Sequence, residues 1–376
     1  MLVGILGGVS GGLSGCLGRS DSETTRTDPI DPSIGDAPMY QCDPLNTGHQ
    51  PETIGPTDGT EQWAFDAGGA VRSSPAVERG IVYFGSDDTL YAIDASDGVP
   101  LWWFETVGAV HSSPAVVDGT VYVGTRGNRL YAVDALDGTE RWVFETNGSI
   151  DASPTVEDGV VYAASQATAG RVYAIDATEG TERWHFETDY RIRSSPAVAD
   201  GVYVGGWDSA VYAIEETDGT ERWRVGTDQP VLSSPAVGNT IYIGANDGYL
   251  YALAPETGDE RWRFETGGIA TTPAVADAVY VGSEASDGGL YAVDPEAGIE
   301  RWSVDTEVAV TTAATVADAV YVGLDDGGVV ALETGSGTER WRFDARETIK
   351  SAPTVVDGTV YVGSNDGRLY AIGTDD

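Results

Sequence analysis

The chain contains very few basic residues. Of its 376 residues, 60 are acidic and 21 are basic, so its net charge is −39, and the basic residues include a single lysine, Lys350. Such a body repels phosphates, which excludes general binding to nucleic acids or to anionic membranes. Its self-repulsion is screened only at high ionic strength, since the Debye length falls to about 3 Å at 1 M salt. We therefore expect a halophilic protein rather than an acidic calcium buffer, because the acidic residues are spread through turns along the whole chain.

Histidine and cysteine are also scarce, with three and two residues respectively. The histidines His49, His111 and His185 lie far apart and none accompanies a nucleophile motif, so no triad of serine, histidine and acid is indicated. Cys42 and His49 are seven residues apart, but a structural zinc site requires four ligands. We therefore predict no catalytic residue and no metal site, and we interpret the segment around Cys42 as a buried strap with a free thiol.

Sustained helical periodicity is lacking as well, and the most regular feature is a recurring tryptophan. Its positions are 39 to 42 residues apart: Trp63, Trp102, Trp142, Trp184, Trp223, Trp262, Trp302 and Trp341. A period near 40 residues indicates a repeat protein, because each unit must bury its apolar faces against its neighbours. We predict that these eight tryptophans are structural residues packed between the units rather than cofactor contacts.

Each repeat contains four short apolar runs in a fixed order, seen in residues 194–198, 202–205, 211–214 and 222–225. Val, Tyr, Ile and Trp dominate these runs, and Asp-Gly turns that favour positive φ separate them, so each run is predicted to be a strand. Four antiparallel strands in a 40-residue repeat describe a propeller blade, and the sequence predicts an all-β propeller with eight such blades. Because the Trp63 strand comes first, it is expected to complete the last blade and close the ring.

The link between the third and fourth strands carries a family resemblance. In residues 174–184, Ala, Asp, Gly and Trp have the spacing of the tryptophan-docking motif of pyrroloquinoline-quinone (PQQ) repeat propellers, and related segments recur through residues 63–376. In that family the tryptophan stacks on the neighbouring blade near the glycine of the motif. The short loops and the lipoprotein-like amino terminus resemble BamB-like assembly lipoproteins and haloarchaeal PQQ-repeat proteins.

The resemblance implies more than one class of activity. BamB-like proteins imply a non-catalytic scaffold without a cofactor. Quinoprotein dehydrogenases of the family use PQQ and calcium, with long inserted loops and adjacent cysteines that this sequence lacks. We therefore predict no cofactor, and PQQ with calcium only under the dehydrogenase alternative. An extracellular glycan-binding module is a third alternative, supported only by Trp207 and Tyr249 in the hairpins of one face.

The amino terminus predicts export and anchoring. Residues 1–16 are apolar and glycine-rich and end in a lipobox-like Leu-Ser-Gly-Cys, so Cys16 is the expected lipidation site, which leaves Cys42 without a disulfide partner. No basic residue precedes Arg19, so either the true start lies upstream of Met1 or the signal is atypical. Residues 17–38 are predicted to be a disordered acidic tether, 39–62 a lead-in segment and 63–376 the propeller. The expected location is the outer face of the cytoplasmic membrane.

One face of the predicted propeller carries a variable set of residues. It contains the loops that lead into the innermost strands, together with the hairpins between second and third strands, and we call it the mouth face. The residue before the repeated Ser-Ser-Pro run changes from blade to blade, being in turn Arg72, His111, Asp151, Arg193, Leu232, Ala270, Thr311 and Lys350. Three of these eight are basic in a chain poor in basic residues. The loops of the other face, the far face, are almost uniformly acidic.

These residues predict a binding site at the mouth of the central channel. A concave mouth with positive potential suits an anionic ligand or an acidic protein partner, because arginine can bind carboxylate or phosphate through two hydrogen bonds. The alternative is that these charges pair with neighbouring acids and only solvate the rim. We predict a monomeric, lipid-anchored binding or assembly scaffold with an unknown protein or anion as its partner. The candidate site residues are Arg72, His111, Asp151, Arg193, Lys350, Arg191 and Trp207.

Overall fold

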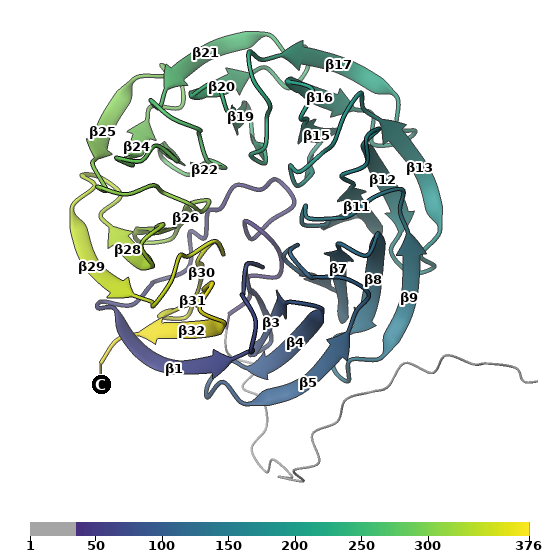
Figure 1. The fold of residues 1–376 in the computed structure, drawn as a ribbon. Coiled ribbons are helices and arrows are strands. Elements are labelled where there is room, and N and C mark those ends of the chain that lie inside the picture. Colours follow the sequence, from purple (N-terminus) through teal and green to yellow (C-terminus); the bar gives the residue numbers. More distant parts are fainter. Residues whose placement is uncertain (1–34, 376) are drawn as a thin grey trace, which may run out of the picture.

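The computed structural model describes residues 35–375, and in this part of the chain it contains strands and no helix. The strands form eight four-stranded antiparallel sheets, which are arranged as blades around a centre (Figure 1). The predicted all-β propeller with eight four-stranded blades is therefore confirmed.

Each blade has an innermost, a second, a third and an outermost strand. The innermost strands are β2 (Ala76–Glu78), β6 (Ala115–Val117), β10 (Thr155–Glu157), β14 (Ala197–Val198), β18 (Ala236–Val237), β22 (Ala274–Val275), β26 (Thr315–Val316) and β30 (Thr354–Val356). The second strands are β3 (Ile81–Ser86), β7 (Thr120–Thr125), β11 (Val160–Ala164), β15 (Val202–Gly205), β19 (Ile241–Gly244), β23 (Val279–Gly282), β27 (Val320–Gly323) and β31 (Thr359–Gly363). The third strands are β4 (Thr89–Asp94), β8 (Arg129–Asp134), β12 (Arg171–Asp176), β16 (Ala210–Ile214), β20 (Tyr249–Leu253), β24 (Leu290–Val293), β28 (Gly328–Leu332) and β32 (Arg368–Gly373). The outermost strands are β5 (Pro100–Glu105), β9 (Glu140–Glu145), β13 (Glu182–Glu187), β17 (Glu221–Gly226), β21 (Glu260–Glu265), β25 (Glu300–Val304), β29 (Glu339–Asp344) and β1 (Thr60–Asp66). Blades are numbered 1 to 8 in the order of their innermost strands.

The two ends of the propeller meet in blade 8, where β1 pairs with β32. Trp63 lies opposite Ala371 and Phe65 opposite Leu369, and β31 and β30 continue this sheet inward. The purple first strand and the yellow last strand accordingly lie side by side in Figure 1. Pairing with β1 covers an edge of β32 that would otherwise be open to another chain. The predicted closure of the ring through the Trp63 strand is confirmed.

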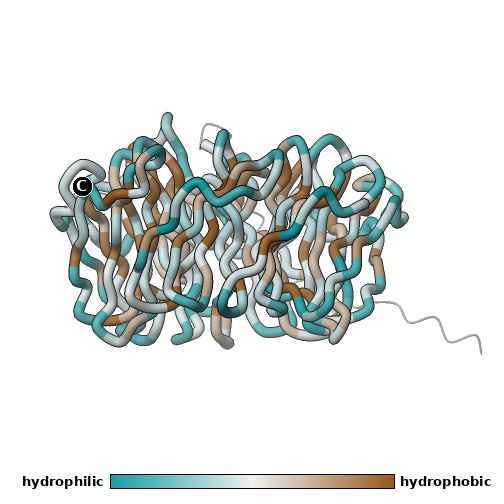
Figure 2. Tube along the Cα trace, turned by 90° about the horizontal axis from the view of Figure 1, so that it is seen from above, coloured by the Kyte–Doolittle hydropathy of each residue, from teal (hydrophilic) through white to brown (hydrophobic). Residues whose placement is uncertain are grey.

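Burial follows the position of a strand in its blade. The second strands β3 and β7 are buried along their whole length, whereas the outermost strand β13 alternates between exposed and half-buried residues. Neighbouring blades cover both faces of an inner strand, whereas solvent reaches one side of an outermost strand, which therefore alternates with a period of two. Seen edge-on in Figure 2, the strands run between the two faces of the ring.

Each outermost strand contributes one tryptophan to the interface with the next blade. Trp102 of β5 is 7% exposed and lies against Gly138 of blade 2, where a β-carbon would stand 2.8 Å from the indole ring. Its Nε1 donates to the carbonyl oxygen of Ala135 at 3.1 Å, and the hydroxyl of Tyr83 donates to the same oxygen at 3.0 Å. An equivalent hydrogen bond to a backbone carbonyl is made by Trp63, Trp142, Trp184, Trp223, Trp262, Trp302 and Trp341. Seven of these indoles thus join two blades by packing and by a hydrogen bond, and the indole of Trp341 donates to Pro56 of the strap, just before β1.

Residues 35–59 form a strap that crosses the middle of the ring before β1 begins, visible as the purple segment at the centre of Figure 1. Ala37 is fully buried and pairs with Val77 of β2, so the ordered strap begins before residue 39, the sequence-based boundary of the lead-in segment. Farther along, strap carbonyls accept hydrogen bonds from the backbone of other innermost strands, in the pairs Pro38 with Val116, Pro44 with Val198, Leu45 with Val237, Thr47 with Val275 and Gly48 with Val316. The strap thereby supplies acceptors to strand edges that face the channel.

Both ends of the strap lie on the far face. Arg79, in the hairpin between β2 and β3, donates its backbone N–H to Asp36 at 2.8 Å, and Gly358, in the hairpin between β30 and β31, donates to Ile54 at 2.9 Å. Asp36 and Ile54, near the two ends of the strap, therefore both lie on the far face. The predicted signal segment 1–16, Cys16 and most of the tether 17–38 lie outside the described residues. Among residues 35–375, no helix is long and apolar enough to cross a membrane.

Candidate ligand site at the mouth of the propeller

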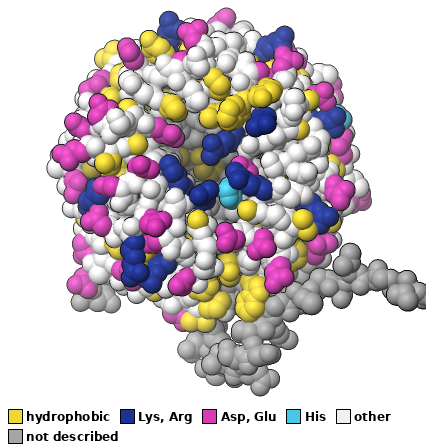
Figure 3. All heavy atoms as spheres, viewed as in Figure 1, with side chains coloured by type: hydrophobic (Ala, Val, Ile, Leu, Met, Phe, Trp, Pro, Cys, Tyr) yellow, Lys and Arg dark blue, Asp and Glu magenta, His cyan; other side chains and the backbone are white. Residues whose placement is uncertain are grey.

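All eight residues that precede the Ser-Ser-Pro run line one cavity of about 480 Å³ on the mouth face. Each of these loops leads from an outermost strand into the innermost strand of the next blade, and the innermost strands surround the centre, so equivalent loop positions converge there. In Figure 3, basic side chains and a histidine gather around a hollow in the middle of this face. The volume lies in the range of about 300–1,000 Å³ that small-molecule sites occupy.

Two of the basic residues in the cavity wall are paired with acids. Arg126 binds both carboxylate oxygens of Asp151, at 2.9 and 2.7 Å. The Nζ of Lys350 lies 3.8 Å from Asp325 Oδ1, which is a looser contact. The sequence left open the alternative that the basic residues only pair with neighbouring acids. This alternative describes Arg126 fully and Lys350 in part.

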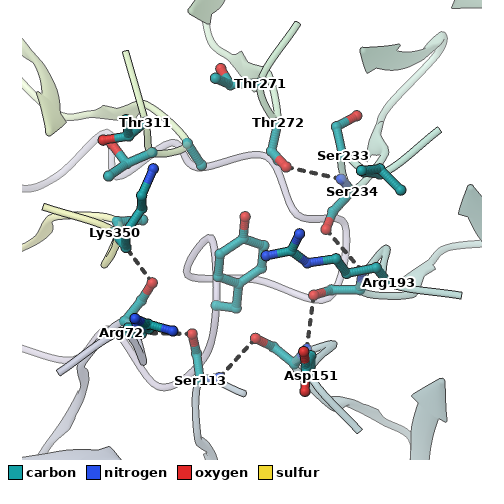
Figure 4. Close-up of a pocket in the computed structure, with 18 of the residues that line it drawn as sticks. Arg72, Ser113, Asp151, Arg193, Ser233, Ser234, Thr271, Thr272, Thr311 and Lys350 are labelled. Atoms are coloured by element: carbon teal, nitrogen blue, oxygen red, sulfur yellow. Dashed lines mark hydrogen bonds between the residues drawn. The ribbon is translucent and has the colours of Figure 1, made fainter. Parts of the chain in front are cut away.

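The other two basic residues are available to a ligand. Arg72 donates through Nε to Asn365 Oδ1 at 3.1 Å, which leaves its terminal nitrogens uncommitted. The guanidinium of Arg193 has no hydrogen bond or ion pair with any residue in the range 35–375, and Figure 4 shows it extending toward the middle of the cavity. Both side chains are exposed to the cavity and neither forms an ion pair with a carboxylate in the described part of the chain, so they contribute positive potential to the site, and the charge of Arg193 also acts on Glu284.

Burial and the charges in the wall shift the pKa values of two neighbouring groups. Burial lowers the pKa of His111, and the positive charges of Arg126, Arg72 and Arg193 lower it further against the opposing effect of Asp151. His111 is therefore neutral at neutral pH and acts as a hydrogen-bonding group. Burial raises the pKa of Asp151, but the hydrogen bonds and the charge of Arg126 outweigh burial, so the pKa is lowered overall and Asp151 is ionised.

The structure does not bring Arg191 and Trp207 into the cavity. The guanidinium of Arg191 lies over the ring of Tyr190, 5.6 Å from its centroid. The backbone N–H of Trp207 donates to the Arg191 carbonyl at 2.9 Å, which ties the two loops together on the mouth face beside the cavity. Sequence position alone placed both residues in the right loops but could not give the direction of their side chains.

Two further sets of cavity residues were missed in the sequence. The first is Tyr40 of the strap, which lines the cavity. The second is a set of hydroxyls in the repeated run itself, from Ser74, Ser113, Ser153, Ser195, Ser234 and Thr272. The hydroxyls repeat from blade to blade, so their position does not stand out in the sequence as the variable positions do. One feature of the sequence could have identified these hydroxyls. The same position is alanine in the last two blades, at Ala313 and Ala352, so it is not the same in every blade.

The donor set of the cavity does not suit a calcium ion. Calcium takes six to eight oxygen ligands, whereas the acidic residues of the wall are Asp151, which Arg126 already engages, and Glu284. Arg72 and Arg193 of the same wall, which form no ion pair with residues 35–375, repel a cation. In the part of the chain that the structure describes, no group of three or more His, Cys, Asp or Glu residues could hold a metal ion. The calcium required under the dehydrogenase alternative therefore has no fitting site among these residues.

The Cys42 thiol of the strap has a raised pKa. Burial raises the pKa of Cys42, and the negative charge of Asp43 raises it further. A thiol with a raised pKa stays protonated at neutral pH and is a poor nucleophile and a poor metal ligand. This environment agrees with the interpretation of Cys42 as a structural residue of the strap.

A known family matches the chain along the whole propeller. The family described as outer membrane protein assembly factor BamB matches residues 52–166, 146–268, 207–333 and 286–376. The chain belongs to this family. The predicted BamB-like PQQ repeats are thus confirmed, and a comparison with curated proteins finds no relative that matches.

Solved structures with the same fold come from proteins of different kinds. BamB from Moraxella catarrhalis aligns with a TM-score of 0.72 and 21% identity over 84% of this chain and 99% of that protein. Quinohemoprotein alcohol dehydrogenase from Comamonas testosteroni aligns with a TM-score of 0.75 and 16% identity over 90% of this chain and 80% of the enzyme. The computationally designed Ika8 protein aligns with a TM-score of 0.74 and 18% identity over 85% of this chain and 100% of the design. At these identities the likeness shows the fold alone, so function has to be argued from the site.

Proposed function

We propose that this BamB-family propeller is a non-catalytic binding or assembly scaffold at the cell surface, which captures an anionic ligand or an acidic partner in its mouth. The observation that carries this proposal is the convergence of Arg72, Arg193 and Lys350 on one cavity of a body with a net charge of −39. A concave site focuses this positive potential, and arginine adds directed hydrogen bonds to a carboxylate or phosphate.

The course of the strap indicates which face of the propeller would turn toward the membrane under this proposal. Because residue 35 leaves the propeller on the far face, a lipid on Cys16 would tether that face and leave the mouth turned away from the membrane. The acidic far face would also be repelled by anionic headgroups. Lipidation of Cys16, a haloarchaeal source and attachment to the outer face of the cytoplasmic membrane remain parts of the proposal.

Replacing Arg72, Arg193 and Lys350 together by alanine should abolish most of the affinity for an acidic probe. A fluorescein-labelled hexaglutamate peptide, followed by fluorescence anisotropy, reports this binding. Hydrogen bonds to charged groups contribute about 1.5–3 kcal/mol each, so the triple variant should bind at least about tenfold more weakly. The measurement belongs at the lowest salt concentration at which the fold persists, because salt screens the contacts.

A matched control removes the same charge from the far face. Arg141, Arg183 and Arg301 pair with Asp134, Asp176 and Asp294 at the outer part of their blades. Their triple alanine variant should bind the peptide as the unmodified chain does. Equal loss in both variants would mean that net charge rather than the mouth governs binding. Reduction of a dye that depends on added PQQ, calcium and an alcohol would contradict the non-catalytic proposal.

A further inference from the structure

The floor of the cavity is a chain of hydroxyls that links consecutive blades. In six successive blades the hydroxyl oxygen accepts a backbone N–H from the preceding blade at 2.9 Å, and in blade 1 the donor is Ala352 of blade 8. These residues are 4 to 8% exposed and all of them line the cavity: Ser74, Ser113, Ser153, Ser195, Ser234 and Thr272. Several of these links are drawn in Figure 4.

This arrangement makes the floor a surface of hydrogen-bond donors. A hydroxyl has one proton to donate and can accept through its oxygen. The backbone N–H occupies one of the two lone pairs of the oxygen, and the proton of each hydroxyl is left to be donated to a ligand. Ser234 and Thr272 lie against the Tyr40 hydroxyl, with which both form side-chain hydrogen bonds. The hydroxyls of blades 1 to 4 have no acceptor among residues 35–375, and an oxyanion is the ligand group that can accept several such protons at once.

The opposite wall of the cavity contains aliphatic side chains among polar residues that include Thr271, Thr311 and Glu284. Leu232 of blade 5, Ile269 and Ala270 of blade 6, and Ala313 of blade 7 line it. Ile269 is 37% exposed although it is a large aliphatic residue. Blades 7 and 8 also lack the floor hydroxyl, because Ala313 and Ala352 occupy that position. The large aliphatic side chains of the cavity, Leu232 and Ile269, therefore lie together on blades 5 and 6, across from the hydroxyls of blades 1 to 4.

The charge of the cavity fits a ligand with one negative charge. Arg126 is neutralised by Asp151, and Lys350 is partly neutralised by Asp325. Arg72 and Arg193 remain, with Glu284 as the other carboxylate of the wall. Burial raises the pKa of Glu284, and the charges of Lys350 and Arg193 oppose that shift. A surplus of about one positive charge matches a carboxylate better than a doubly charged phosphate.

We infer that the mouth binds a carboxylate that carries an apolar group. The carboxylate lies on the hydroxyls of blades 1 to 4 beneath Arg72 and Arg193, and the apolar group lies against Leu232 and Ile269. This inference rests on the proposed function and specifies the ligand class of the same site. A small organic acid and the carboxyl terminus of a polypeptide with an apolar last residue share this chemistry.

Isothermal titration with matched probes tests the ligand class. 4-Methylpentanoate should bind at least about tenfold more tightly than acetate, since each buried methylene contributes about 0.8 kcal/mol. 4-Methylpentan-1-ol should not bind measurably, and inorganic phosphate should bind more weakly than 4-methylpentanoate. The peptide Gly-Gly-Leu and its carboxamide distinguish the two sources: binding of the free acid peptide alone assigns a polypeptide end, and binding of 4-methylpentanoate without the peptide assigns a small acid.

Substitutions at the floor and the wall test the two halves of the cavity separately. Ser153→Ala with Ser195→Ala should weaken 4-methylpentanoate at least about tenfold, because two donors to a charged group are lost. Ser153→Thr with Ser195→Thr is the matched control and should retain binding, since Thr272 makes the same link in blade 6. Leu232→Ala with Ile269→Ala should remove the preference for 4-methylpentanoate over acetate. Thermal unfolding verifies the fold of each variant, and Ala313 and Ala352 show that a blade accepts alanine at the floor position.

Three results would overturn the inference: equal affinity for acetate and 4-methylpentanoate, equal affinity of the Gly-Gly-Leu acid and its amide when the peptide binds, or unchanged affinity in the folded Ser153→Ala, Ser195→Ala variant. Binding of hexaglutamate with loss in the Arg72, Arg193 and Lys350 variant would leave the proposed function standing in each case. If hexaglutamate does not bind but 4-methylpentanoate binds as described, only the proposal of an acidic protein partner would be rejected.

Discussion

The midpoint of thermal unfolding should rise by about 10 °C or more between 0.1 M and 2 M sodium chloride. The chain has a net charge of −39, and its acidic residues lie on the surface of all blades, so the folded state is destabilised by repulsion at low salt. At 0.1 M the Debye length is about 10 Å and at 1 M about 3 Å, which removes most of the repulsion between neighbouring carboxylates. A change of about 1 kcal/mol moves the midpoint of a large domain by about 2–4 °C, so a gain of several kcal/mol gives this shift.

A charge variant separates repulsion from other effects of salt. Glu105, Glu179, Glu256 and Glu265 are exposed, and their replacement by glutamine lowers the net negative charge without touching the core. This variant should be more stable than the unmodified chain at 0.1 M sodium chloride, and it should gain less from added salt. Circular dichroism during heating measures both midpoints. A midpoint that does not change with salt in the unmodified chain would show that self-repulsion is not a major cost of this fold.

Trp102→Ala should lower the free energy of unfolding by roughly 3–5 kcal/mol, the range for removing a large aromatic side chain from a core. The indole is 7% exposed, its ring centroid lies 5.9 Å from that of Tyr83, and its Nε1 donates across the blade interface to Ala135. Alanine leaves a cavity between blades 1 and 2 that Gly138 cannot fill. Chemical denaturation followed by circular dichroism measures the loss.

The next residue of the same strand provides the control. Trp103 points to the other side of β5 and is partly exposed. Trp103→Ala therefore removes the same atoms from a position that is more accessible to solvent. It should cost clearly less than Trp102→Ala, because less apolar area leaves water when the chain folds. Equal costs at the two positions would contradict the role of Trp102 as the link between blades.

The propeller itself could be read from local patterns. The Trp period, the Asp-Gly turns and the strand order are repeated eight times, and repetition turns a weak local signal into a clear one. At Asp118 and Gly119 both turn residues have positive φ, at 50° and 69°, as the Asp-Gly pair predicts. The path of the strap could not be read this way. Its carbonyls meet the innermost strands of several blades, and a single non-repeating segment carries no periodic signal for such pairing.

The position of the candidate site could be predicted from the sequence, but its ion pairs and the directions of its side chains could not. Equivalent loop positions in a closed ring must converge, so the variable residues from Arg72 to Lys350 line one cavity. The sequence does not show that Asp151 neutralises Arg126 while the guanidinium of Arg193 forms no hydrogen bond or ion pair with residues 35–375. It also does not show that Arg191 turns away onto Tyr190.

The sequence by itself therefore determined the blades, their number, the closure through Trp63 and the acidic surface, because these depend on the order and period of residues along the chain. The tertiary structure alone decided which positive charges stay available, which hydroxyls form a donor floor and how Tyr40 reaches the mouth. Hydrogen bonds and ion pairs act over about 3–4 Å, so their partners are set by the packing of blades that lie far apart in the sequence.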